Sequence, residues 1–467
     1  MRLALGAACV AACLAGAGAL AAPLPSPLTL EVALKLAEEA AHPALLESEA
    51  ARDEARAAQL QAESLTGARA SLSARARAVE PGPSASNKER DDHRVMLRVE
   101  KPLYDFGRSE AQEAAAGAGL RAAELRHADA RSRRRIEVMT RYFEVLLADL
   151  EGARDTEAMA TAYVELDRAR MRQELGQYSA VRVLESESRY MEVRQRMYAS
   201  EAKARTTRAR LALALNRPDE LPSNLAPPHL QALKTAAPDL AGLLAEAQVA
   251  NPALAAAREE SAAAQERVAA ARASSRPRLN GEVERAQYSR TLGSNDRWRI
   301  GVELEVPLYD GGRDTAAIAQ ALAAQKRAQA RLQAAQLEVA EQVREAWERL
   351  RVVQAQRDTA KTLGDYRDQY LDRSRALYEL EVKADLGDAM VQTSEARLQT
   401  ARADFDMALA WARLDALLGK PVYDGSAPPA SAAVKLPPKV PSPVALPPAA
   451  TSPAAAPPPA APAKATP

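Results

Sequence analysis

Lys101-Pro102-Leu103-Tyr104-Asp105-Phe106-Gly107-Arg108 is an octapeptide that returns in the second half of the chain as Val306-Pro307-Leu308-Tyr309-Asp310-Gly311-Gly312-Arg313. In both places an alternating pattern of apolar and polar residues precedes it and a long helical pattern follows it. His-Pro-Ala-Leu at 42–45 and Asn-Pro-Ala-Leu at 251–254 stand at nearly the same offset from the two octapeptides. We therefore interpret the chain as two copies of one unit.

Each octapeptide is predicted to turn a strand into a helix. Its proline lacks a backbone N–H and should stop strand pairing, and its glycines give the backbone the freedom to turn. Its tyrosine is interpreted as part of this turn, and in the alternative also as an anchor at a membrane interface. The residues assigned to the two turns are Pro102, Tyr104, Gly107, Arg108, Pro307, Tyr309, Gly312 and Arg313.

Two alternating runs precede each octapeptide and predict two β-hairpins. The runs are 71–79 and 94–103 in the first half, and 279–288 and 298–306 in the second half. They place the hairpins at about 68–103 and about 278–308. Each run has about the ten residues that a tilted strand needs to cross a bilayer.

Four such strands cannot form a stable membrane structure within one chain. A lone hairpin is marginal in water, and the smallest useful barrels need about eight strands. An open sheet in lipid leaves the backbone groups of its edges unpaired, at a cost of several kcal/mol each. If the hairpins lie in a membrane, several chains must therefore combine their strands.

Very long helices are predicted after each octapeptide. In the first half they run from 109 to about 176 and from 180 to about 215, and in the second half from 315 to about 379 and from 388 to 418. A helix of about 65 residues is roughly 100 Å long, and pairing with its successor makes an antiparallel coiled-coil hairpin. Two apolar stripes should hold these helices: Ile136, Met139, Phe143, Leu146 and Leu150, and Val339, Val343, Trp347 and Leu350. Shorter helices should start at Thr29, as an N-cap, and at Pro43.

The composition is that of long helices rather than of a large globular core. Aromatic residues make up only 4% of the 467 residues, and the formal net charge of +1 gives no reason to expect a nucleic-acid partner. Arg2 followed by an apolar, alanine-rich run predicts a signal peptide at 1–22, the alternative being a first transmembrane helix. Both cysteines, Cys9 and Cys13, lie inside it, which excludes disulfides from the mature chain. Cys13 also weakly resembles a lipoprotein processing site.

The predicted organisation follows from these signals. It is a signal peptide at 1–22, a first repeat at 23–221 with a long helix pair at 109–215, a linker at 222–238, a second repeat at 239–424 with a long helix pair at 314–418, and a tail at 425–467. The tail is rich in Pro and Ala and should be a disordered spacer or, in the alternative, a basic extended arm that touches a partner.

This layout resembles the TolC-like outer-membrane efflux protein family over about 28–423. The resemblance rests on the Pro-Leu-Tyr-Asp-x-Gly-Arg motif, found twice, and on Glu174-Leu175-Gly176-Gln177-Tyr178-Ser179 before the returning helix. The second break departs from the family pattern, because Glu381 stands where glycine is usual.

The resemblance implies a mainly α fold with a small β part. Three chains would form an α-helical tunnel topped by a 12-stranded transmembrane β-barrel in outer-membrane lipid, with a large periplasmic part. The implied partners are a periplasmic adaptor (membrane fusion) protein and an inner-membrane transporter, in a tripartite efflux or type I secretion system. Substrates would cross without chemical change, so no enzyme activity is expected.

The resemblance places a gate at the periplasmic tip, where family members use acidic rings and Tyr–Arg contacts. The candidates are Tyr378, Lys383, Asp385 and Asp388. The simpler interpretation is that Asp385 or Asp388 favours a helix N-terminus. No catalytic, cofactor-binding or metal-binding residues are predicted, because the histidines lack metal-ligand spacing and no phosphate loop is present. The alternative function is that of a soluble periplasmic coiled-coil adaptor or scaffold protein.

Overall fold

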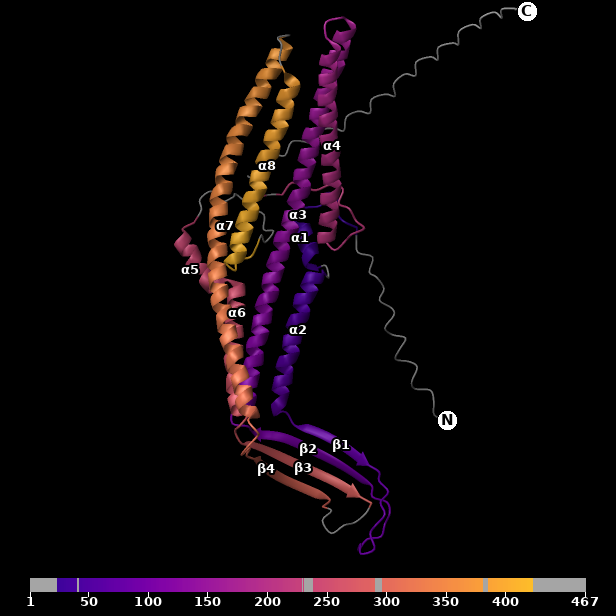
Figure 1. Cartoon of the computed structure of the whole chain (residues 1–467), viewed down its shortest axis with the longest axis vertical. Helices are drawn as coiled ribbons and strands as arrows, with labels where there is room; N and C mark the ends of the chain where they lie inside the picture. Colours follow the sequence, from indigo (N-terminus) through magenta and orange to yellow (C-terminus); the bar gives the residue numbers. More distant parts are fainter. Residues whose placement is uncertain are drawn as a thin grey trace, which may run out of the picture.

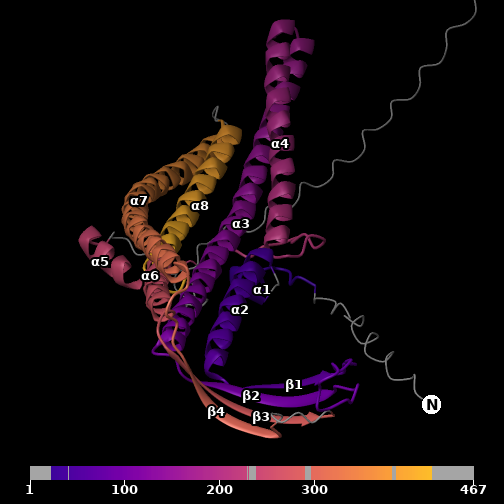
Figure 2. The same cartoon turned by 60° about the horizontal axis from the view of Figure 1, so that its bottom comes forward.

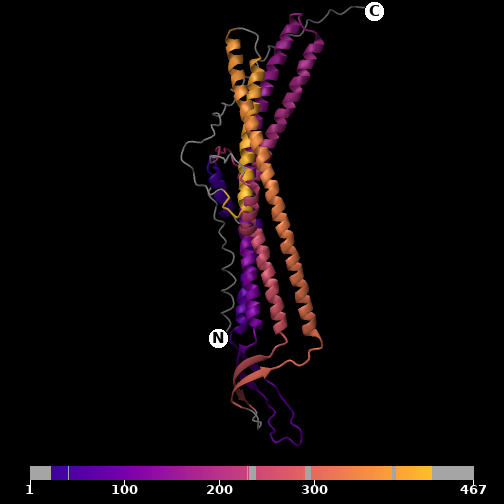
Figure 3. The ribbon, with the colours of Figure 1, turned by 90° about the vertical axis from the view of Figure 1, so that its left-hand side faces the viewer.

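The computed structural model describes residues 23–39, 42–228, 230, 238–289, 296–380 and 385–422. The predicted signal peptide, with Cys9 and Cys13, and the predicted tail at 425–467 lie outside the described residues, as does Lys383. Long helices run along the molecule and a single β-sheet lies at one end (Figure 1). Seen from its side the molecule is elongated, and its two long helical hairpins diverge toward the end away from the sheet (Figure 3).

The first half runs from short helices through two strands to a helical hairpin. Its elements are α1 (Leu30–Glu39), α2 (Pro43–Glu63), β1 (Arg69–Arg75), β2 (Arg94–Tyr104), α3 (Arg108–Glu174) and α4 (Ala180–Ala214), with a short 3-10 turn between α2 and β1. Thr29 Oγ1 accepts a hydrogen bond from the backbone N–H of Val32 at 3.3 Å. Pro43 lies in the first turn of α2. Both predicted helix starts are therefore confirmed.

The second half repeats the same order of elements. They are α5 (Leu240–Ala250), α6 (Pro252–Ala273), β3 (Arg278–Tyr288), β4 (Trp298–Glu305), α7 (Arg313–Glu379) and α8 (Leu386–Leu417). Asn251 starts α6, because its Oδ1 accepts from the backbone N–H of Leu254 at 2.9 Å. The side-chain amide of Asn251 donates to the carbonyl of Leu417 at 2.9 Å and thereby joins α6 to the end of α8.

The four strands form one antiparallel sheet in the order β1-β2-β3-β4. The central pair, β2 and β3, joins the two halves of the chain. β1 ends at Arg75 rather than near 79, and beyond it only Ala78 forms an isolated bridge, to Asp91. The prediction of a strand over 71–79 is therefore wrong at its C-terminal end.

The prediction that Pro102 stops strand pairing is also wrong. Pro102 is still opposite Asn280, and Tyr104 is opposite Leu279, so that Leu103 is an extra residue in the register. A β-bulge of this kind interrupts the ladder locally, and proline is tolerated there because the regular hydrogen-bond pattern is already broken. Pro307 differs, because β4 ends two residues before it, at Glu305.

The helices form a layer that continues from the sheet. α2 packs on α3, α3 on α6 and α6 on α7, while α3 pairs with α4, α7 with α8, and α3 also with α8 (Figure 2). Phe143 and Phe405 stack with ring centroids 4.6 Å apart, which fixes α3 against α8. The predicted stripes pack into two hydrophobic clusters, with Ile136, Leu150 and Trp347 only partly buried.

Candidate functional site

The sheet has one apolar face. Cross-strand pairs such as Leu72–Leu97, Val99–Val283 and Val283–Ile300 place apolar side chains on the same side. Among the described residues little covers this face: Trp298 is 58% exposed, Ile300 77% and Val302 66%. An exposed apolar face of this kind marks contact with lipid or with another protein.

The other face of the sheet is polar and carries ion pairs that join three of the strands. Arg98 and Arg299, on β2 and β4, both pair with Glu284 on β3, the Arg299–Glu284 distance being 3.5 Å. Glu284 is buried between them. β1 and β4 form the two edges, and neither has a further strand partner among the described residues. An edge strand with free N–H and C=O groups is a template for pairing with another chain.

Aspartate and glycine build both turns from strand to helix. Gly107 and Gly312 cap α3 and α7 with φ of 89°, a left-handed conformation that favours glycine. Asp105 Oδ2 accepts from the backbone N–H of Ser109 at 2.8 Å, and Asp310 Oδ2 accepts from that of Asp314 at 2.5 Å. That hydrogen bond is the main reason that the pKa of the Asp310 carboxyl lies below its usual value. Sequence reasoning missed this role of the two aspartates, although their position three residues before the helix was visible.

The tyrosines of the two turns lie on the surface. Tyr104 is 58% exposed and its ring packs edge-on against Phe106, with centroids 4.7 Å apart. Tyr309 is 91% exposed. Arg108 and Arg313 are the first residues of α3 and α7. Arg276 Nη1 donates to the carbonyl of Phe106 at 2.8 Å, so the first turn is also tied to the segment before β3.

The gate candidates lie at the tip of the second helical hairpin. Tyr378 is in the last turn of α7 and is 57% exposed. Asp385 is the N-cap of α8, and its Oδ1 accepts from the backbone N–H of Asp388 at 3.2 Å. Asp388 in turn accepts a hydrogen bond from the side-chain amide of Gln392. The structure thus brings Asp385 and Asp388 together. Asp385 caps the N-terminus of α8, as the simpler of the two sequence interpretations predicted.

The tip of the first helical hairpin has a different surface. Gly176 follows α3 with φ of 69°. Arg172 Nη1 donates to the hydroxyl of Tyr178 at 2.6 Å, and its guanidinium lies 5.2 Å from the centre of that ring. Leu175 and Val181 are exposed beside them. This tip therefore presents apolar side chains next to a fixed arginine–tyrosine pair.

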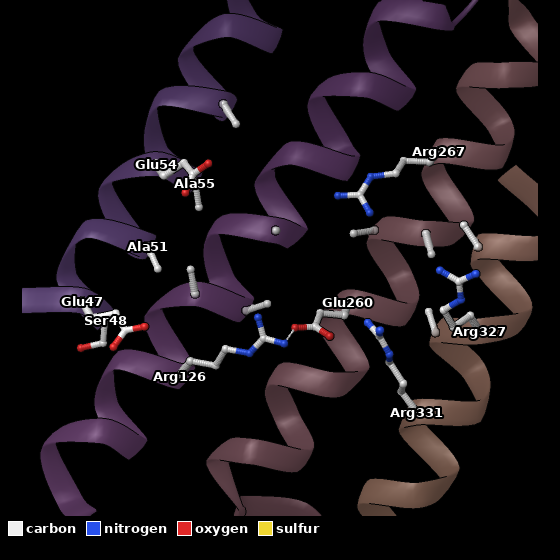
Figure 4. A pocket seen from close by; sticks show the side chains of 18 of the residues that line it. Glu47, Ser48, Ala51, Glu54, Ala55, Arg126, Glu260, Arg267, Arg327 and Arg331 are labelled. Carbon is white, nitrogen blue, oxygen red and sulfur yellow. Dashed lines mark ion pairs between the residues drawn. The ribbon is translucent and has the colours of Figure 1, made fainter. Parts of the chain in front are cut away.

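A hollow of about 820 Å³ lies on one face of the helical layer, between α2, α3, α6 and α7 (Figure 4). Small alanine side chains form much of its wall, and Arg126 pairs with Glu260 across it. A second hollow of about 700 Å³ shares Ala58 and Arg267 with the first and reaches the sheet. The residues that it takes from the sheet include Arg69, Pro102 and Asn280.

No metal centre is evident in the part of the chain that the structure describes, because no three His, Cys, Asp or Glu side chains are grouped to hold an ion. Within the same ranges, none of the helices is both long and apolar enough to cross a membrane.

Comparison with known proteins identifies relatives of this architecture. Residues 243–420 match the family model described as outer membrane efflux protein. No curated protein sequence matches the chain. The family match therefore covers most of the second half, from within α5 to the end of α8.

Solved structures extend the likeness over most of the chain. The outer membrane protein VceC of Vibrio cholerae is 19% identical with a TM-score of 0.68, and the match covers 84% of this chain and 97% of VceC. The CmeC outer membrane channel of Campylobacter jejuni is 14% identical, with a TM-score of 0.69 and coverage of 84% and 85%. The MtrE outer membrane channel of Neisseria gonorrhoeae, in its open state, is 20% identical, with a TM-score of 0.64 and coverage of 84% and 89%. At these identities the likeness is one of fold. Together with the family match it confirms the resemblance to the TolC-like outer-membrane efflux proteins.

Proposed function

We propose that this chain, TolC-like in fold and matched to the outer membrane efflux protein family in its second half, forms a passive trimeric duct. Three chains would pool their four-stranded sheets into one 12-stranded barrel in the outer membrane, and their helices into a tunnel through the periplasm. Cargo would pass from an inner-membrane transporter and its adaptor without chemical change.

The observation that carries this proposal is the two-faced sheet with open edges. Trp298, Ile300 and Val302 expose apolar surface on one side, while Arg98 and Glu284 pair on the other. In lipid the edges of such a sheet must be paired, because each unpaired backbone group costs several kcal/mol. If β4 of one chain pairs with β1 of the next around a closed ring, the backbone groups of both edges are hydrogen-bonded. The apolar face then meets lipid and the polar face meets water.

Membrane partition and oligomeric state test the proposal. The full chain should sediment with outer membranes, resist extraction by high salt or carbonate, and run on gels as a heat-sensitive trimer. In planar bilayers the purified protein should give discrete conductance steps.

The competing function, a soluble periplasmic coiled-coil adaptor or scaffold, makes the opposite predictions. Such a protein would be removed from membranes by carbonate, remain in solution without detergent and produce no conductance in planar bilayers. Substitution of Ile300 by Arg separates the two further. An arginine on a lipid-facing strand costs up to about 2–4 kcal/mol at the bilayer midplane, so this substitution should weaken membrane assembly, while a soluble scaffold would tolerate it.

A further inference from the structure

The two hollows lie on the same side of the molecule as the polar face of the sheet. Pro102 and Asn280 are opposite each other in the register, as are Arg69 and Glu100, so these side chains share the face that carries the Arg98–Glu284 pair. Arg69, Pro102 and Asn280 also line the second hollow. The polar face of a membrane sheet faces the interior. The hollows therefore line the interior of the proposed duct, on which this inference rests.

Arginine dominates the charge of this interior wall. Seven arginines and four carboxylates line the two hollows, an excess of three positive charges per chain. Two of the four carboxylates are already engaged, since Glu260 pairs with Arg126 and Asp105 binds the start of α3. On the sheet, by contrast, Arg98 and Arg299 share Glu284.

Three of these arginines have no partner among the residues that the structure describes. Arg267 on α6 and Arg327 and Arg331 on α7 point into the first hollow, and only the Arg126–Glu260 pair is joined there (Figure 4). Within the described residues none of the three makes a hydrogen bond, an ion pair or a ring contact. Arg327 and Arg331 are four positions apart, so they stand one helical turn apart on the same face. Like charges at this spacing destabilise a helix. Among the residues that the structure describes, no hydrogen bond or ion pair of these two arginines offsets this repulsion.

We propose that Arg267, Arg327 and Arg331, here called the arginine belt, make the duct prefer anions and bind small multivalent anions in transit. In a trimer the belt supplies nine guanidinium groups around one water-filled passage. Arginine side chains of this kind set anion preference in pores, and the guanidinium fork matches phosphate and carboxylate oxygens. The alanines of the wall leave the space that such anions need.

Bilayer recordings in a potassium chloride gradient test the belt, at about 0.1 M so that the Debye length stays near 10 Å. The reversal potential of the wild-type duct should have the sign expected when chloride is more permeant than potassium. Inorganic tripolyphosphate should block the wild-type duct. The triple variant R267Q/R327Q/R331Q should lose the chloride preference and raise the blocking concentration at least tenfold. The triple variant R267K/R327K/R331K should keep both, because it keeps the charge.

A matched control lies in a groove between α2 and α3, on a different side of these helices from the first hollow. Arg56 lines that groove, whereas its neighbour Ala55 lines the first hollow. The two side chains are therefore about 100° apart around the axis of α2. Arg331→Gln and Arg56→Gln remove the same charge from each chain. Only Arg331→Gln should shift the reversal potential.

Three results overturn the proposal in distinguishable ways. A wild-type protein that forms no channel would contradict both the proposed duct and the proposed role of the arginine belt. If the channel is cation-selective, or if the triple glutamine variant leaves its selectivity unchanged, only the proposed role of the arginine belt is contradicted. Unchanged selectivity with a lower melting temperature of the trimer would instead assign the arginines to the contact between subunits.

Discussion

Arg154 Nη1 on α3 lies 2.6 Å from Glu395 Oε2 on α8, so an ion pair joins the first repeat to the second. Beside it Ser394 donates to the carboxylate of Glu157. The two helical hairpins are thus held together by side-chain bonds in the half of the molecule away from the sheet, where Phe143 and Phe405 also stack. Any separation of α3 from α8 at this level must break these contacts.

Removing either partner of the Arg154–Glu395 pair should weaken the α3–α8 contact. Glu395→Gln should lower stability by about 0.5–1 kcal/mol, because the pair is partly exposed. Arg154→Ala should cost more, because it also removes the partner of the buried Asp155. The double variant should melt close to Arg154→Ala alone, since that change already removes the bond that Glu395→Gln weakens. The measurement is the temperature at which the trimer loses its helical circular dichroism. Additive losses would contradict the coupling.

The same pair gives a pH dependence with a defined sign. Burial raises the pKa of Glu395, but the hydrogen bonds from Arg154 and Gln399 outweigh it and leave the pKa lowered. A lowered folded-state pKa means that the pair contributes fully above the unfolded value, about 4.3 for Glu, and that this contribution is lost as pH falls through the folded value. The melting difference between wild type and Glu395→Gln should therefore be constant near pH 7 and shrink below about pH 4.

Gly387 on α8 should tolerate no side chain. A Cβ at this position would lie 2.7 Å from Thr161 Cγ2 on α3. Gly387→Ala should cost about 1–3 kcal/mol by overpacking. Thr161→Ala removes the closest contacting atoms, so the double variant should regain most of the loss in thermal melting. A stabilised Gly387→Ala single variant would show that α3 and α8 do not approach so closely.

Gly107 and Gly312 should be the sensitive glycines of the two turns. Both have φ of 89°, where an L side chain is strained by about 1–2 kcal/mol. Gly107→Ala should therefore lower the yield and melting temperature of the trimer. Gly152→Ala is the control, since Gly152 lies inside α3 with open space around it. Alanine there should stabilise by about 0.5–1 kcal/mol.

Asp388 is expected to attract cations at the tip, whereas Asp385 also holds the helix start. Three copies of Asp388 around an axis would form an acidic ring. Asp388→Asn should weaken block by hexamminecobalt in bilayer recordings by about tenfold. Asp385→Ser keeps a capping oxygen and so tests charge without loss of the cap. Asp372→Asn, an exposed carboxylate on α7, is the control. Unchanged block in Asp388→Asn removes that residue from the gate.

Most elements of this fold follow from local signals. These signals act within a few residues of chain: Thr29 as a helix cap, Pro43 at a helix start, and the period-two pattern of Trp298, Ile300 and Val302. Such signals locate helices and strands wherever the chain later packs. The errors fall where tertiary contacts compete with local preference: Pro102 remains in β2 because β3 offers a partner on the other side of a bulge.

The side-chain pattern alone could specify two repeated units, their amphipathic strands and their long helices, because these depend on spacing and turn chemistry along the chain. Only the folded molecule decides that β2 pairs with β3, that α3 meets α8, and that Arg267, Arg327 and Arg331 share one hollow. Those partners are far apart in sequence, and which side of a polar helix faces the interior depends on its neighbours. The residue pattern within one helix therefore cannot predict which of its polar sides faces the interior.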